Sequence, residues 1–246
     1  MRDQIFHILF AWYPYVCLTV FLVGSLIRFD REPYSWRASS SQILRKRQLR
    51  WGSNLFHIGV LFLFFGHFVG LLTPTWLYTM VMTVPQKQAI AVFAGGIAGL
   101  LCFIGLSLLL ARRLFDVRIR ATSTRMDIII LTILWIQLTL GLLTLPLSLQ
   151  HSDGSVMLVL AHWAQSVVTL QYIDTVAMQG LAWPYLLHLV LGMTIFLLFP
   201  FSRLVHVWSA PVWYLGRRGY QVVRTRRSLP LAAKGPTQIG ERSKSA

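Results

Sequence analysis

Four histidines lie within two long apolar runs of the sequence, where ionisable side chains are rare. His57 and His67 belong to SNLFHIGVLFLFFGHFVG at 53–70, and His188 and His206 belong to PYLLHLVLGMTIFLLFPFSRLVHVWS at 184–209. An ionisable side chain inside a membrane-spanning segment is costly, so it indicates a functional site whose partners lie on another segment. Two histidines on each of two segments are the arrangement needed to hold two cofactors between two helices.

The histidines pair by depth if the two segments run antiparallel. His57 then faces His206, and His67 faces His188. Each pair can supply the two axial imidazoles of a haem b iron, and such a six-coordinate centre transfers electrons without an open position for oxygen. On continuous helices His188 and His206 point the same way, about five turns apart, whereas His57 and His67 are about 80° out of phase. The rises, about 27 Å and about 15 Å, also differ, so tilt and a kink at Pro200 must absorb part of the difference.

Two other interpretations of these histidines are compatible with the sequence. They could form hydrogen bonds between helices, or they could bind zinc, although a paired arrangement without carboxylates or thiolates is unlike the usual tetrahedral zinc site. Four histidines at matching depths favour haem. The remaining histidines, His7, His151 and His162, fall at the outer end or in an outer loop and are interpreted as interfacial residues.

Composition assigns the chain to the membrane. Of 246 residues, 55% are hydrophobic and 13% charged, whereas soluble domains are about 25% charged. Five segments meet the length of roughly 17–25 residues that a spanning helix needs, at 5–27, 52–72, 88–111, 126–149 and 181–208. The first lacks a cleavage motif and is interpreted as a retained helix. The sequence therefore predicts an all-α integral membrane protein with five transmembrane helices and haems held between the second and the fifth.

The basic residues predict the topology. All but two of the 23 Lys and Arg residues lie in the connections 28–51 and 112–125 or from Arg203 onward, and the exceptions are Arg2 and Lys87. The positive-inside rule places the amino terminus outside and the carboxyl terminus in the cytoplasm. The net charge of +15 thus reflects orientation, and we expect no nucleic-acid partner. Residues 1–226 are expected to form the five-helix domain, and 227–246 a basic, disordered cytoplasmic tail.

Some of these cations lie beside the expected sites. Arg203, Arg112 and Arg113 share the depth of the inner histidine pair and are candidates to bind haem propionates, although each also fits a simple positive-inside anchor. Lys87 is the only cation on the outer side after the first helix. It is either a snorkelling interfacial lysine or a hydrogen-bond donor to a quinol oxygen beside the outer haem.

Local signals refine the helices. Thr124 and Asp127 have the spacing of a capping box at the start of the fourth helix. The two cysteines, Cys17 and Cys102, fall within apolar runs and are interpreted as small buried hydrophobes rather than a disulfide or metal site. The connection 150–180, which lacks Lys and Arg, contains a stretch that could lie along the membrane surface. Small residues where helices or a flat ring could approach closely are Gly66, Gly70, Gly95, Gly96 and Gly99.

Five runs of this sequence resemble one family in order, from about residue 13 to 227. They are RASSSQILRKR, SNLFHIGVLFLFFGHFVGLLTP, AVFAGG, WAQSVVTL and LHLVLGMTIFLLFPFSRLVHVWSAPVWYL. They are similar to the gamma (cytochrome b) subunit of the membrane-bound respiratory nitrate reductase. In that family the axial haem ligands fall on His57, His67, His188 and His206, and the quinol-site lysine falls on Lys87.

This resemblance implies a subunit of the bacterial cytoplasmic (inner) membrane that binds two haems b and oxidises quinol, either ubiquinol or menaquinol, near the outer face. Electrons would pass to an iron–sulfur beta subunit and a molybdenum-containing alpha subunit on the cytoplasmic side, where nitrate is reduced. It links the chain to anaerobic respiration and nitrate assimilation. Two alternatives remain from the residues alone: a two-haem subunit of another cytoplasm-facing reductase, and a haem-free membrane anchor or transporter. The absence of an internal repeat argues against a transporter.

Overall fold

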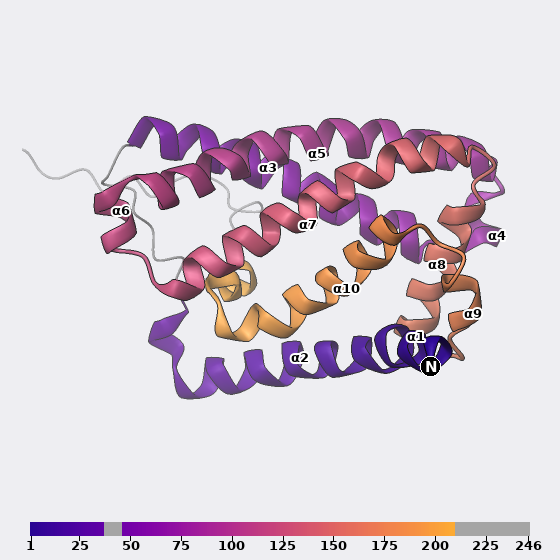
Figure 1. Ribbon diagram of the computed structural model, residues 1–246, viewed down its shortest axis with the longest axis horizontal. Coiled ribbons are helices and arrows are strands. Elements are labelled where there is room, and N and C mark those ends of the chain that lie inside the picture. Colours follow the sequence, from indigo (N-terminus) through magenta and orange to yellow (C-terminus); the bar gives the residue numbers. More distant parts are fainter. Residues whose placement is uncertain (37–45, 210–246) are drawn as a thin grey trace, which may run out of the picture. The chain divides into compact units, whose positions relative to one another are not determined.

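The part of the chain that the computed structural model describes, residues 1–36 and 46–209, is built from helices without a strand (Figure 1). Five helices are long and apolar enough to cross a membrane, which confirms the all-α prediction and the number of spans. Their bounds are Arg2–Arg31, Arg47–Leu72, Val84–Phe115, Arg125–Gln150 and Trp183–Phe201. The predicted disordered tail, 227–246, lies outside the described residues.

The first span is one continuous helical segment made of three parts. These are α1 (Arg2–His7), the π-helical η1 (Ile8–Trp12) and α2 (Tyr13–Arg31). Pro14 lies directly after the π-helical turn, at the start of α2. Because proline has no N–H to donate, the hydrogen-bond ladder must shift near it. A short 3-10 turn, η2 (Pro33–Ser35), follows α2.

Two long helices, α3 (Lys46–Leu72) and α5 (Val84–Phe115), pack closely against each other. An added Cβ at Gly105 would collide with the main-chain nitrogen of Phe56, and one at Gly59 would lie 2.6 Å from that of Cys102. The sequence indicated other glycines as small faces. An added Cβ at three of these, Gly66, Gly70 and Gly95, would have no neighbour within 4 Å. The tight helix crossing therefore depends on glycines that the sequence analysis did not identify.

The capping prediction for the fourth span is confirmed. Asp127 N donates to Thr124 Oγ1 at 3.2 Å, and Thr124 N donates to Asp127 Oδ2 at 3.0 Å, at the start of α7 (Arg125–Gln150). Between α5 and α7 lies the short α6 (Val117–Ala121). Both Cys17 and Cys102 are buried and free, also as predicted.

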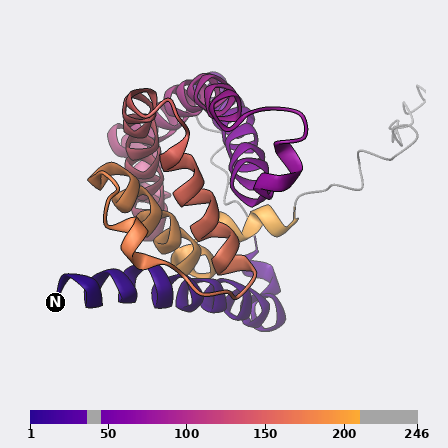
Figure 2. The ribbon, with the colours of Figure 1, turned by 90° about the vertical axis from the view of Figure 1, so that its right-hand side faces the viewer.

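The connections at the end opposite α6 fold into short helices (Figure 2). They are α4 (Thr75–Tyr78), α8 (Ser155–Val168) and α9 (Thr175–Met178). The stretch expected along the membrane surface is α8, which is a packed helix: Trp163 Nε1 donates to the Phe10 main-chain oxygen at 2.9 Å. Gln165 Nε2 donates at 2.9 Å to the carbonyl of Leu71, at the end of α3. This end of the bundle is therefore closed by side chains from α8.

The fifth span differs from the prediction. The sequence predicted one helix over 181–208 with a kink at Pro200. A break does lie at Pro200, but it ends the α-helix: α10 (Trp183–Leu198) gives way to two 3-10 segments, η3 (Phe199–Phe201) and η4 (Arg203–Ser209). Pro200 cannot donate to the helical ladder, and Ser202 is extended, with φ −116° and ψ 178°. The expectation that His188 and His206 share one helix face is therefore wrong, because no continuous helix joins them.

Candidate functional site

The structure brings together one of the two expected histidine pairs. The rings of His67, on α3, and His188, on α10, have centroids 6.2 Å apart and planes inclined at 33°. His67 lies near the end of α3 and His188 near the start of α10, so the two helices meet at this level in antiparallel order.

All four histidines bond a main-chain carbonyl through Nδ1. The acceptors are Ser53 for His57 at 2.7 Å, Leu63 for His67 at 2.7 Å, Gln137 for His188 at 3.0 Å, and Arg203 for His206. Because a carbonyl oxygen only accepts, Nδ1 carries the proton and Nε2 keeps the lone pair. Metal-bound histidines usually have such a bond on the other ring nitrogen. His151 makes a similar bond to Leu147, so the bond alone does not identify a ligand.

The His67–His188 pair fits a shared iron by its spacing. With metal–nitrogen bonds of about 2.0 Å, two imidazoles on opposite sides of one iron have ring centres about 6.3 Å apart; the observed spacing is 6.2 Å. Gly66 and Gly70 leave open space on α3 beside His67. The described residues contain no group of three or more His, Cys, Asp or Glu that could hold a metal ion. The pair itself offers two imidazole nitrogens, the number that a haem iron with two axial histidines takes from the protein.

Two residues of α7, Gln137 and Gly141, surround His188 and were missed in the sequence. Gln137 Nε2 donates to the main-chain oxygen of His188 at 3.0 Å and lies 3.4 Å from its Nε2. A Cβ at Gly141 would lie 2.9 Å from Cε1 of the His188 ring. A lone amide in the apolar run LWIQLTLG was the only available signal, and nothing in the sequence indicated its partner.

The second expected pair, His57 and His206, is not in direct contact: among the described residues no ring contact joins the two side chains. The two histidines nevertheless lie at the same end of the bundle. Gly52, five residues before His57, packs against Leu109 near the end of α5. Arg113, at that end of α5, contacts Asp127, which also binds Arg203, three residues before His206. We call this end, defined by Arg28, Arg113 and Arg203, the basic end.

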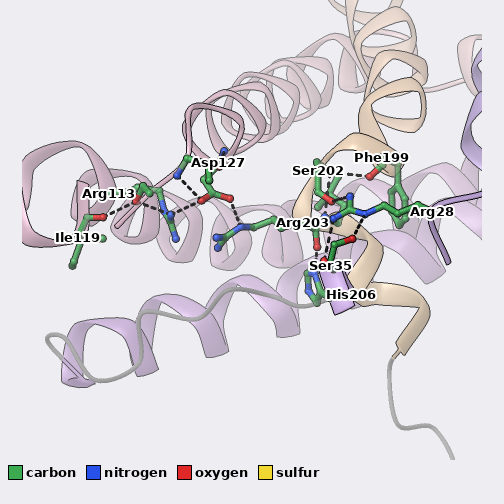
Figure 3. Close-up of polar contacts among 12 residues, drawn as sticks. Arg28, Ser35, Arg113, Ile119, Asp127, Phe199, Ser202, Arg203 and His206 are labelled. Carbon is green, nitrogen blue, oxygen red and sulfur yellow. Dashed lines mark hydrogen bonds and ion pairs between the residues drawn. The ribbon is translucent and has the colours of Figure 1, made fainter. Parts of the chain in front are cut away.

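The basic end contains a buried carboxylate with two arginine partners (Figure 3). Arg203 Nε lies 2.7 Å from Asp127 Oδ1, and Arg113 Nη1 lies 3.3 Å from Oδ2. The side chains of Arg113 and Asp127 are 9% and 10% exposed. Arg113 and Arg203 thus share one carboxylate. Arg112 is also buried, at the end of α5. From the sequence, Asp127 was recognisable only as a helix cap.

Lys87 lies at the opposite end, in the first turn of α5. Its Nζ is 3.8 Å from the centre of the Tyr78 ring, and Tyr78 is buried. Such a contact is worth about 0.5–2 kcal/mol. The ammonium group of Lys87 therefore contacts α4 through the Tyr78 ring. Tyr78 was not identified from the sequence, because the connection 73–83 gave no periodic pattern.

Comparison with known proteins identifies the family. Residues 6–226 match the family model of the nitrate reductase gamma subunit. The chain is 56% identical over 217 residues to the respiratory nitrate reductase 1 gamma chain of Escherichia coli (strain K12), covering 88% of this chain and 96% of the relative. It is 57% identical over 215 residues to the respiratory nitrate reductase 2 gamma chain of the same organism, covering 87% and 95%.

A more distant relative agrees. The nitrate reductase gamma chain of Bacillus subtilis (strain 168) is 36% identical over 221 residues, which cover 89% of this chain and 98% of the relative. These matches confirm the resemblance that the sequence runs indicated. The five spanning helices and the comparisons together show that the chain belongs to the nitrate reductase gamma subunit family and is a membrane subunit of a respiratory oxidoreductase complex.

Proposed function

We propose that this chain is a dihaem b subunit that oxidises quinol at the Lys87 end and delivers the electrons at the basic end. The observation that carries the proposal is the pair formed by His67 and His188, whose 6.2 Å ring spacing fits one shared iron. His57 and His206 are assigned to the second haem. The receiving partners are an iron–sulfur beta subunit and a molybdenum-containing alpha subunit, where nitrate is reduced.

Haem b held by two imidazoles supplies one-electron transfer without an open coordination position. The chain's own residues fix the ligands. Each Nδ1–H is held by a main-chain carbonyl, which sets the tautomer and leaves Nε2 as the donor atom. At His188 the ring is also confined by Gly141. Arg112 and Arg203 are proposed to bind propionates at the basic end, with Asp127 sharing Arg203.

Lys87 is proposed to bind the substrate. Its ammonium rests on the Tyr78 ring, which leaves N–H donors to bind a quinol oxygen, since an ammonium has three. Quinol is oxidised there with release of its two protons on that side. The chain then carries the electrons toward the basic end, while the protons stay behind.

Orientation follows from the basic residues: the Lys87 end faces outward and the basic end faces the cytoplasm. Moving one electron fully across the membrane toward a negative interior requires about 2.3 kcal/mol per 100 mV of membrane potential. The reaction therefore conserves energy as membrane potential. We expect a reporter enzyme fused after Ala246 to be active only in the cytoplasm. A periplasmic signal would reverse the orientation.

The reduced-minus-oxidised absorption spectrum of the purified complex tests the function. We expect the bands of two low-spin haems b that quinol reduces. A spectrum without haem would favour the alternative of a haem-free anchor or transporter. The family assignment favours a nitrate reductase over another cytoplasm-facing reductase, and the two Escherichia coli relatives are named respiratory enzymes, which gives no support to nitrate assimilation.

A further inference from the structure

The segment that carries His206 is separated from α10 by a break in the helix. Ser202 is extended, and its Oγ accepts from Leu204 N at 3.1 Å, after which η4 begins at Arg203. Carbonyl groups at such a break lose their helical donors and must find others where water is scarce. The hydrogen-bond ladder of α10 therefore does not fix the direction of η4, and other elements have to do so.

Arg28, near the end of α2, supplies donors to the break (Figure 3). Its Nη1 donates to the main-chain oxygens of Pro200 at 2.6 Å and Ser202 at 2.8 Å. Its Nε and Nη2 bind Ser35 at 3.0 Å and 3.1 Å. Because the guanidinium is planar and is bonded from two sides, it holds the two carbonyls in a fixed geometry.

The same face of α2 contacts Pro200 at the break and Trp208 beyond it. Phe21, Gly24 and Arg28 follow the i, i+3, i+7 spacing of one helix face. A Cβ at Gly24 would lie 2.8 Å from Pro200 Cγ, so α2 touches the proline closely. The ring of Phe21 stacks on that of Trp208, in η4, at 5.4 Å and 27°. One stripe of α2 thus contacts both the break and the segment beyond it.

A second contact reaches the same segment from α7. Asp127 accepts from Arg203 Nε at 2.7 Å, and its own position is set by the capping box with Thr124 and by Arg113. The main-chain oxygen of Arg203 is in turn the acceptor for His206 Nδ1. Asp127 therefore acts on His206 through one intervening residue.

We propose that α2, which carries none of the four histidines, is the template that places His206 through Phe21, Gly24 and Arg28, with Asp127 locking the segment through Arg203. The inference rests on the proposed role of His206 as a haem ligand. On a continuous helix His206 would lie about 12 Å farther from His188 than His57 does from His67, and the break near Pro200 removes that requirement. Arg28 and Asp127 are positioning residues for the haem at the basic end.

The test uses the full chain in its complex, purified from membranes. The variants are Arg28→Gln, Gly24→Ala and Asp127→Asn. The matched controls are Arg31→Gln and Asp30→Asn, which change exposed residues of the same type at the same end of α2. Three quantities are measured: the paramagnetic resonance signal of each ferric haem, the rate of haem transfer to apomyoglobin, and hydrogen–deuterium exchange of the main chain over 199–209.

We expect the three variants to change only the haem assigned to His206. Loss of residues that orient a metal ligand typically costs about 10–100-fold in affinity, so this haem should transfer about tenfold faster than in the controls, with an altered resonance signal. The other haem should keep its wild-type signal. Arg28→Lys keeps the charge but not the planar fork, and it should fall between wild type and Arg28→Gln. Exchange over 199–209 should accelerate in parallel.

The outcomes separate this inference from the proposed function. Variants that match the controls in all three measurements would overturn the proposal that α2 places His206. Equal loss of both haems would also overturn it, because the contacts would then support the whole bundle. A wild-type complex without haem would overturn the proposed function instead, and exchange over 199–209 in the variants would still decide whether α2 holds this segment.

Discussion

Replacement of His67 or His188 by Ala is expected to remove one haem and leave the other in place. Each change deletes one of two axial ligands at a site where the rings lie 6.2 Å apart, and the remaining imidazole cannot hold a six-coordinate iron alone. Haem content should fall by about half, from two to one per chain. The measurement is the pyridine haemochrome content of the purified complex, with the difference spectrum to show which haem remains.

The companion changes distinguish the two sites. Replacement of His57 or His206 by Ala should remove the other haem, and the two pairs of variants should give complementary spectra. His162→Ala is the control, because His162 is an exposed histidine on α8. Full haem content in the four variants would refute the assignment, and identical residual spectra in His67→Ala and His57→Ala would refute the pairing.

Lys87→Ala should slow quinol oxidation strongly while both haems stay bound. A hydrogen bond from a charged donor is worth about 1.5–3 kcal/mol, which corresponds to a fall of about ten- to a hundredfold in kcat/KM for quinol. The assay follows quinol oxidation by the membrane-bound complex, together with binding of a quinol analogue. Tyr78→Leu removes the ring that holds the ammonium and should have a smaller effect in the same direction.

The control for this prediction is Arg2→Ala. Besides Lys87, Arg2 is the Lys or Arg residue that lies outside the three basic stretches of the sequence. It is exposed and bound to the main-chain oxygen of Gln179. Arg2→Ala removes one positive charge, as Lys87→Ala does, so it distinguishes the loss of a specific hydrogen-bond donor from a change in overall charge. A normal rate of quinol oxidation in Lys87→Ala would leave Lys87 as an interfacial anchor and would move the quinol site elsewhere.

The sequence by itself determined the features that depend on neighbouring residues along the chain. The five spans follow from the lengths of their apolar runs, because a bilayer imposes a minimum helix length. The capping box of Thr124 and Asp127 is local and was predicted correctly. The four histidines stood out because ionisable groups are rare in such runs. The pairing of His67 with His188 followed from the antiparallel order of their two segments, and their rings do lie 6.2 Å apart.

Only the tertiary structure decided the features that join distant parts of the chain. Pro146 lies inside α7 without ending it, whereas the helix breaks near Pro200. A proline removes one donor in both places, so the proline alone does not decide whether the helix ends. At the break, Arg28, more than 170 residues away in the sequence, binds the main-chain oxygens of Pro200 and Ser202.

The double role of Asp127 and the close crossing at Gly105 were undetermined for the same reason. Helical periodicity shows which residues share a face. It does not show which face of another helix these residues contact. In the proposal above, such a contact, between α2 and the segment 199–209, places His206.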